Sequence, residues 1–220
     1  NSRGSPTELV AMIDDVTPAL VLADSRRAEL IREGGYTGRM LDLTHPFDSQ
    51  EVERRAAEPV PDPGVAKAED PCAILFTSGT TGPSKAIMWS QAGINFWCTQ
   101  NAIARTVSAD DIEYTCLPMF HANALLNSTL TSFMAGASVA LTDKYSTTRF
   151  WGEIRASRAT RFNSLGAVAN FLWAQPPGTG DRDHDLRVCS MAPVPAYAAQ
   201  FEERFGVRIF TGYGLSDYCL

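Results

Sequence analysis

The sequence predicts an α/β domain built on a largely parallel sheet flanked by helices, and three observations lead to this fold class. Short apolar runs alternate with amphipathic segments five or six times along the chain, which is typical of repeated strand–helix units. The chain has 220 residues, of which 45% are hydrophobic and 20% charged, enough for a substantial core. Glycine or proline stands at several of the expected element ends, where these residues interrupt regular structure.

The strands are predicted from short apolar runs, and the helices from the segments between them. The strands are expected at residues 17–24, 39–43, 73–76, 112–117, 138–141, 160–164, 186–191 and 207–211. The helices are expected at residues 26–33, 51–58, 90–107, 123–134, 166–174 and 195–205, with a further one from residue 147 through 154. Ser25, Ser90 and Thr147 are the expected N-terminal caps, and Pro195 is the expected first residue of the last helix.

Two stretches before the glycine-rich segment are expected to be irregular. Residues 44–50 are expected to form a loop, and the proline-rich residues 59–64 a stiff connector. This connector is either a domain boundary or a surface loop, and we favour the loop.

Composition and charge exclude several classes of function. The net charge is −6 and no run of Lys and Arg is long enough to form a nucleic-acid-binding surface. The five cysteines are odd in number, widely spaced and without a C-x-x-C pair, which argues against a disulfide framework and a zinc site. Reduced cysteines predict a cytoplasmic protein. No apolar run is long enough to span a membrane, and the start at Asn1 rather than methionine indicates a piece of a longer protein.

The residues from Thr77 to Lys85 are the most distinctive stretch of the chain. They place hydroxyls, two glycines and one lysine between apolar runs, at Thr77, Ser78, Gly79, Thr80, Thr81, Gly82, Ser84 and Lys85. Exposed amides, hydroxyls and a cation suit a nucleotide's phosphates, although an ordinary polar loop has a similar composition. The stretch does not fit a P-loop, because Ser84 replaces its second glycine and Ala86 its metal-binding hydroxyl.

A second distinctive stretch, Gly212 to Asp217, follows the last expected strand. Asp217 is placed to hold Mg²⁺, and Tyr213 could present its ring to a nucleotide base. Two alternatives stay open. One is a tight turn with a packed tyrosine. The other is the serine-hydrolase elbow G-x-S-x-G, with Ser216 as nucleophile, which fails only at Tyr218.

Ligands of parallel α/β sheets bind beyond the carboxyl ends of the strands. Four segments are expected to gather there, at residues 77–85, 118–123, 164–167 and 212–217. His121 lies in the second of them, and without an adjacent Ser or Cys its expected role is structural or gating rather than acid–base.

Taken together, these segments resemble the adenylate-forming family of acyl-CoA synthetases, peptide-synthetase adenylation domains and luciferases. Residues 77–85 resemble its phosphate loop, and residues 117–121 (Leu-Pro-Met-Phe-His) its next motif. Residues 192–195 resemble its Gly-Ala-Pro segment, and residues 211–217 its Tyr-Gly-x-Thr-Glu motif. Residues 144–153 and 175–177 look most like the carnitine/crotonobetaine-CoA ligase branch.

The resemblance implies two reactions: a carboxylate attacks the α-phosphate of ATP, and a thiol, expected to be coenzyme A, then takes the acyl group. It implies that ATP is held by Thr77, Ser78, Gly79, Thr80, Thr81, Gly82, Lys85, Ala192, Pro193, Tyr213, Gly214 and Ser216. It implies Mg²⁺ at Asp217 and Thr80, and an acyl pocket lined by His121, Ser164, Gly166 and Gly212. The chain would then be part of the large N-terminal domain, with residues 1–220 a partial AMP-binding domain that lacks the small C-terminal domain.

The sequence departs from the family pattern at two of these positions. Asp217 stands where the family usually has glutamate, so the shorter side chain would contact Mg²⁺ either directly or through water. Met191 stands where glycine is usual and is expected to crowd the adenine edge. The leading hypothesis is therefore a fragment of an acid–thiol ligase. The alternatives are a catalytically incomplete nucleotide- or acyl-binding module and, with less support, a serine hydrolase.

Overall fold

The computed structural model describes residues 4–44, 64–77, 84–215 and 218–219. The chain divides into two compact units, which we describe separately. The first contains Asn1–Asp70 and Phe76–Ala86, and the second contains Pro71–Leu75 and Ile87–Leu220.

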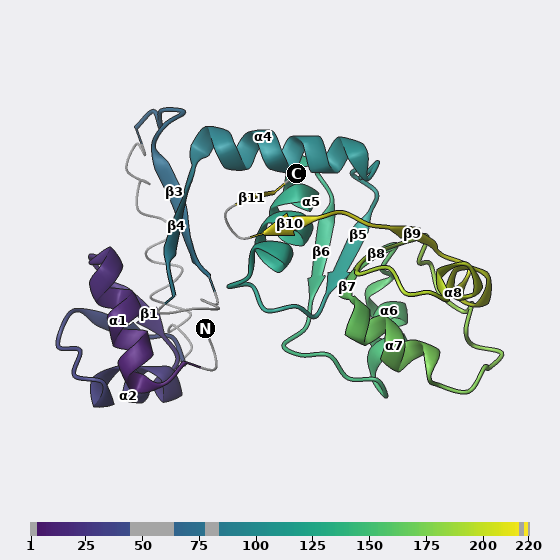
Figure 1. Cartoon of the computed structure of the whole chain (residues 1–220), viewed down its shortest axis with the longest axis horizontal. Coiled ribbons are helices and arrows are strands. Elements are labelled where there is room, and N and C mark those ends of the chain that lie inside the picture. The colour runs from purple at the N-terminus through teal and green to yellow at the C-terminus, as the bar shows by residue number, and fades with distance from the viewer. Residues whose placement is uncertain (1–3, 45–63, 78–83, 216–217, 220) are drawn as a thin grey trace, which may run out of the picture. The chain divides into compact units, whose positions relative to one another are not determined.

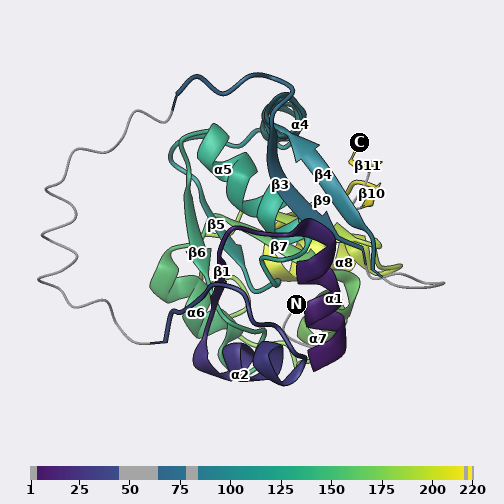
Figure 2. The same ribbon diagram turned by 90° about the vertical axis from the view of Figure 1, so that its left-hand side faces the viewer.

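The first unit packs two helices against two short parallel strands (Figure 2). Its elements are α1 (Pro6–Val16), β1 (Val21–Ala23), α2 (Ser25–Glu33) and β2 (Met40–Asp42). A capping box begins α1: the Ser5 hydroxyl accepts from the Glu8 backbone N–H, and the Glu8 carboxylate accepts from the Ser5 N–H. The cap of α2 is Asp24 rather than the predicted Ser25, because the Asp24 carboxylate accepts the Arg27 backbone N–H at 3.0 Å.

The second unit is built on a five-stranded sheet, and every strand pair in it is parallel. Its strands are β5 (Ile112–Thr115), β6 (Ser138–Leu141), β7 (Arg161–Leu165), β8 (Val188–Ala192) and β9 (Arg208–Phe210), in the order β6-β5-β7-β8-β9. The predicted fold class, a largely parallel sheet flanked by helices, is confirmed.

Helices lie on both faces of this sheet (Figure 1). One side carries α4 (Gln91–Ala104), the π-helix η1 (Asn123–Leu130) and α5 (Thr131–Met134). The other side carries α6 (Phe150–Ser157), α7 (Gly166–Trp173) and α8 (Ala198–Phe205). The main core lies on this second side, where Phe150, Leu172 and Phe205 pack against Phe162 of β7.

The opposite face of the sheet is polar, which is unusual for a buried surface. Glu113 of β5 accepts two hydrogen bonds from Arg105 Nη2, at 2.8 and 2.9 Å, and both side chains are fully buried. Arg161 of β7 lies between Glu113 and Asp111, at 3.6 and 3.5 Å, and donates to the Arg105 carbonyl at 2.6 Å. Arg105 and Arg161 offset part of the cost of burying the Glu113 carboxylate, but burial outweighs them and raises the pKa of Glu113.

Several predicted boundaries are wrong by a few residues. Thr147 does not cap α6, whose first turn begins after Arg149 without a side-chain cap. Pro195 precedes α8 by a short turn, because α8 begins at Ala198. Ser90 caps α4 as predicted, but α4 ends at Ala104 rather than near residue 107. The helix predicted at 123–134 is a π-helix over its first eight residues.

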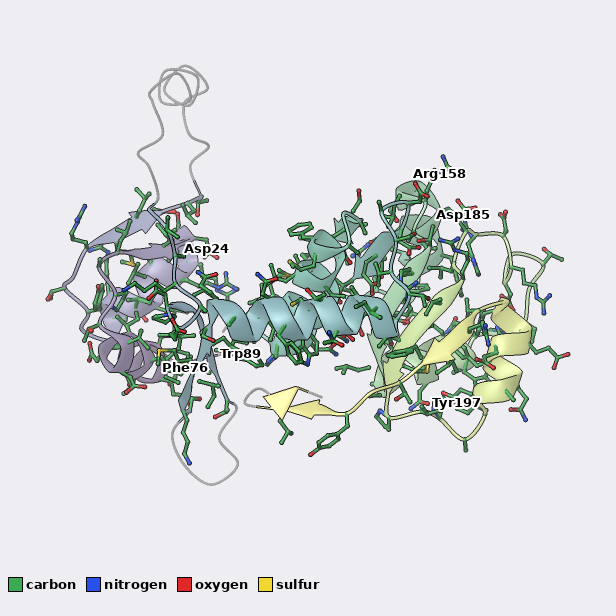
Figure 3. The ribbon with its side chains drawn as sticks, turned by 90° about the horizontal axis from the view of Figure 1, so that it is seen from above. Asp24, Phe76, Trp89, Arg158, Asp185 and Tyr197 are labelled. Carbon is green, nitrogen blue, oxygen red and sulfur yellow. The ribbon has the colours of Figure 1, made fainter. Side chains whose placement is uncertain are left out.

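The strands β3 (Pro71–Phe76) and β4 (Ala86–Ser90) form a separate two-stranded sheet. Trp89 of β4, labelled in Figure 3, packs against a small core around Leu75, Cys98 and Leu126. The segment 77–85 therefore joins β3 to β4, and the expectation that it follows a strand of the main parallel sheet is wrong.

Two short strands, β10 (Gly214–Leu215) and β11 (Tyr218–Cys219), pair antiparallel near the end of the chain and were not predicted. The helix predicted at 51–58 lies outside the described residues, as do the loop at 44–50 and the connector at 59–64 except for Thr44 and Gly64. Among the helices that the structure describes, none is long and apolar enough to cross a membrane.

Candidate active site

The carboxyl ends of β5, β7, β8 and β9 form one edge of the five-stranded sheet, because all of its strands run in the same direction. The predicted site residues that follow or end these strands are His121, Ser164, Gly166, Ala192, Pro193, Gly212, Tyr213 and Gly214. This edge is therefore the candidate active site of the second unit.

Gly166 and Pro193 connect two predicted parts of the site. Leu165, the last residue of β7, pairs with Ala192, the last residue of β8, so Gly166 and Pro193 leave the sheet side by side. A Cβ built on Gly166 would lie 3.1 Å from Pro193 Cδ and 3.1 Å from its carbonyl oxygen. The Ala192–Pro193 peptide bond is cis. The residue predicted for the acyl pocket thus contacts the residue predicted beside adenine.

Ser164 and Leu165 lie on opposite faces of β7, as successive strand residues do. The Ser164 side chain is buried, and its hydroxyl donates to the Leu165 carbonyl at 2.8 Å. Leu165 is 47% exposed. Sequence reasoning missed Leu165, although its place at the end of a predicted strand beside Gly166 could have indicated it.

Tyr213 is the exposed aromatic residue at this edge, with 67% of its surface accessible. A Cβ built on the preceding residue, Gly212, would meet no atom within 4 Å, so the space beside the main chain is open. The following residue, Gly214, begins β10. An exposed ring next to open main chain has the shape needed to stack on a flat ligand.

His121 lies between β5 and η1, and its backbone is held on both sides. Its N–H donates to the Pro118 carbonyl and its own carbonyl accepts from the Leu125 N–H, both at 3.0 Å. The imidazole is exposed and packs against the Phe120 ring, with 4.4 Å between the ring centroids. The main chain thus holds His121 at the point where the chain leaves β5 and enters the π-helix.

Thr77 and Lys85 belong to the first unit and bracket the predicted phosphate loop. The Thr77 N–H donates to the Lys85 carbonyl at 3.0 Å, and the Lys85 N–H donates to the Thr77 hydroxyl at 3.2 Å. Lys85 is exposed, so its ammonium group is accessible. The remaining predicted residues lie outside the described part of the chain: Ser78, Gly79, Thr80, Thr81, Gly82, Ser216 and Asp217.

Met191 does not crowd the candidate site as expected. Its side chain is buried in the main core with Phe162, on the face opposite the exposed Ala192. The extra volume relative to glycine therefore fills the core.

Comparison with known proteins places this geometry in a family. The profile of the family described as "AMP-binding enzyme" matches residues 1–220. The chain belongs to the AMP-binding enzyme family. It is 34% identical over 215 residues to the steroid-22-oyl-CoA synthetase of Rhodococcus jostii (strain RHA1), covering 96% of this chain and 39% of that protein. It is 34% identical over 151 residues to the crotonobetaine/carnitine–CoA ligase of Shigella sonnei (strain Ss046), covering 68% of this chain and 29% of that protein.

Solved structures agree on the fold. The inhibitor-bound N-terminal domain of FACL13 from Mycobacterium tuberculosis superposes with a TM-score of 0.81 at 21% identity, covering 98% of this chain and 55% of that one. The chain spans 39% and 29% of the lengths of the two curated relatives named above.

The side chains at this edge of the sheet indicate which chemistry it could support. Among the predicted site residues at this edge, His121 and Tyr213 carry the ionisable side chains. Cys116, directly after β5, is not a nucleophile at neutral pH, because burial raises the pKa of its thiol to about 11. The described part of the chain contains no group of three or more His, Cys, Asp or Glu residues that could hold a metal ion. The exposed Tyr213 ring and the exposed Leu165 side chain give this edge a flat surface and an apolar surface.

Proposed function

We propose that the intact protein containing this chain is an ATP-dependent acid–thiol ligase. A carboxylate oxygen attacks the α-phosphorus of ATP, the bond to the β-phosphate oxygen breaks, and acyl-adenylate and pyrophosphate form. A thiol sulfur, proposed to be that of coenzyme A, then attacks the acyl carbon, and AMP leaves. Such transfers depend mainly on positioning and on neutralising charge.

The packing of Gly166 against Pro193 is the observation that carries this proposal. It places Gly166, which is proposed to line the acyl pocket with His121, Ser164 and Gly212, beside Pro193, which is proposed to bind adenine with Ala192, Tyr213 and Gly214. A carboxylate and an adenine nucleotide bound at one continuous surface can react directly, because their reacting atoms are held together. The AMP-binding family and its CoA-ligase members support the same chemistry.

The phosphates are proposed to bind the loop between Thr77 and Lys85, with Ser216 as a further contact. Lys85 would neutralise part of the phosphate charge, and its exposed side chain suits that role. Mg²⁺ is proposed at Asp217 and Thr80, which both lie outside the described residues, and it would neutralise phosphate charge there. We also propose a cytoplasmic location. Residues 1–220 are proposed to form part of the large domain, and the small C-terminal domain is proposed to belong to the remainder of the intact protein.

Exchange of labelled pyrophosphate into ATP, dependent on an added carboxylic acid, tests this function in the intact protein. We expect Lys85→Ala to lower the exchange rate by about 100-fold, because a preorganised charge partner is lost. Lys67→Ala is the matched control, since Lys67 is also exposed and lies outside the proposed site. Asp217→Ala should lower the rate as well. Equal rates for the Lys85 variant and the wild type would overturn the proposed role of the loop.

Calorimetry of the 220-residue chain with MgATP addresses the alternative of a catalytically incomplete binding module. Binding by the chain, combined with no exchange by the intact protein, would favour that module over the ligase. Labelling of Ser216 by a serine-reactive probe would favour the hydrolase instead.

A further inference from the structure

The π-helix η1 is attached to the central strands by a network of amide side chains. Asn163 of β7 is buried, and its Nδ2 donates to Asn123 Oδ1 at 2.8 Å and to Ser128 Oγ at 2.6 Å. Asn123 Oδ1 also accepts from Asn127 Nδ2 at 3.0 Å. At the far end of the network, Asn101 of α4 donates to Asn127 Oδ1 at 2.6 Å and to Thr131 Oγ1 at 3.0 Å.

The π-helical geometry is supported by side chains as well as by the backbone. The Thr129 hydroxyl donates to the Ala124 carbonyl at 3.0 Å, and the Thr131 hydroxyl donates to the Leu126 carbonyl at 2.8 Å. Each bond spans five residues, which is the spacing of a π-helix. Because π-helices are rare and occur frequently at functional sites, a segment of eight residues held by such bonds calls for a functional explanation.

The position of Asn163 links this helix to the candidate site. Asn163 pairs with Ser190 in the sheet and directly precedes Ser164, so it belongs to the strand that forms part of the proposed acyl pocket. Its partner Asn123 is two residues after His121, whose carbonyl already accepts the N–H of Leu125 within the helix. A shift of the first turn of η1 would therefore move His121 relative to the end of β7.

We propose that Asn163 is a positioning residue for the acyl pocket, which acts by holding Asn123 and Ser128 and thereby sets the place of His121 at the carboxyl edge of the sheet. This inference rests on the proposed ligase function for its effect on the substrate. The positions of His121 and Gly166 would then be coupled, because β7 leads into Gly166 and also holds the helix η1 that follows His121.

Two variants of Asn163 and one control test this role in the intact protein. Asn163→Asp keeps the shape but replaces the donating amide with an oxygen, and Asn163→Ala removes the amide with all its hydrogen bonds to Asn123 and Ser128. The control, Asn101→Ala, also removes an amide that donates twice to the same helical region, but at the end away from His121. In acid-dependent pyrophosphate exchange, we expect both Asn163 variants to raise KM for the acid by about tenfold. KM for ATP should stay within about twofold of the wild-type value, and the control should change neither.

Histidine-selective NMR provides a second readout that does not depend on activity. The His121 imidazole resonance, assigned with His121→Gln, should shift or broaden in the Asn163 variants and remain unchanged in Asn101→Ala. If an Asn163 variant fails to fold, Asn123→Ala removes the same bond from the half-buried helix side and should give the same two effects.

The outcomes separate this inference from the proposed function. Absence of exchange in the wild type would refute the ligase function, and the His121 resonance would then decide on positioning alone. An unchanged resonance in folded Asn163 variants would overturn the inference, as would equal effects of the Asn163 and Asn101 substitutions.

Discussion

The buried ion pair between Glu113 and Arg105 offers a test of how the polar face of the sheet is stabilised. Glu113→Gln keeps the side-chain volume and removes the charge that lies against two guanidinium groups, Arg105 at 2.8 Å and Arg161 at 3.6 Å. Because none of these side chains is more than 3% exposed, water cannot replace the lost carboxylate. Breaking a buried pair in this way costs about 3–5 kcal/mol.

The exposed pair Arg158–Asp185, labelled in Figure 3, is the matched control. Its atoms are 3.6 Å apart, and its side chains are 82% and 57% exposed. Asp185→Asn should therefore cost less than about 1 kcal/mol, as exposed ion pairs generally do. Tm should therefore fall at least about threefold more for Glu113→Gln than for Asp185→Asn.

Thermal and urea unfolding of the intact protein, followed by circular dichroism, would measure both variants. A loss below about 1 kcal/mol for Glu113→Gln, or equal losses for the two variants, would refute the assignment of Glu113 as a stabilising partner of buried arginines.

Two further predictions concern the core and the acid stability of the sheet. Met191→Gly introduces the residue that is usual in the family. It should destabilise the protein by about 2–5 kcal/mol in urea unfolding, because it leaves a cavity in the core that contains Phe162. An unchanged free energy of unfolding would show that the core does not need the Met191 side chain. Burial by itself would raise the pKa of Asp111. Hydrogen bonds from the Thr160 hydroxyl and the Ser108 N–H, together with the nearby Arg161 guanidinium, outweigh burial, so the pKa of Asp111 lies below its usual range. The resulting stabilisation is present above about pH 4 and is lost as the pH falls through the lowered folded-state pKa. Asp111→Asn should therefore flatten the acid limb of the curve of unfolding free energy against pH. An unchanged acid limb would contradict this prediction.

The parallel sheet could be predicted from the sequence because apolar runs and turn residues report on burial along each strand. The same signal reports less well on local hydrogen bonding. Residues 123–134 have a helical pattern, but apolar spacing does not distinguish a π-helix from an α-helix. Asn123 and Ser128, which attach this helix to the sheet, accept hydrogen bonds from Asn163 of β7, far away in the sequence. At α2, both Asp24 and Ser25 suit a cap, and the carboxylate forms the bond to Arg27.

The sequence predicts only part of the arrangement of the candidate site residues. Tyr213, Gly166 and Pro193 do follow ends of parallel strands. The loop from Thr77 to Lys85 does not, because β3 and β4 pair with each other rather than with the main sheet, and strand pairing is a long-range property that local composition does not report. The Asn163 network was missed for a similar reason, since its partners come from two helices.

The contact between Gly166 and Pro193 also constrains how this protein can change over evolution. A Cβ at position 166 would lie 3.1 Å from the ring and 3.1 Å from the carbonyl oxygen of Pro193, so the proline would have to shift slightly, and we expect substitutions at the two positions to be energetically coupled. A substitution at one position would displace the other unless both changed together. Homologues that differ at position 166 should therefore differ at position 193 as well, and libraries built to alter acid selectivity should vary this pair jointly.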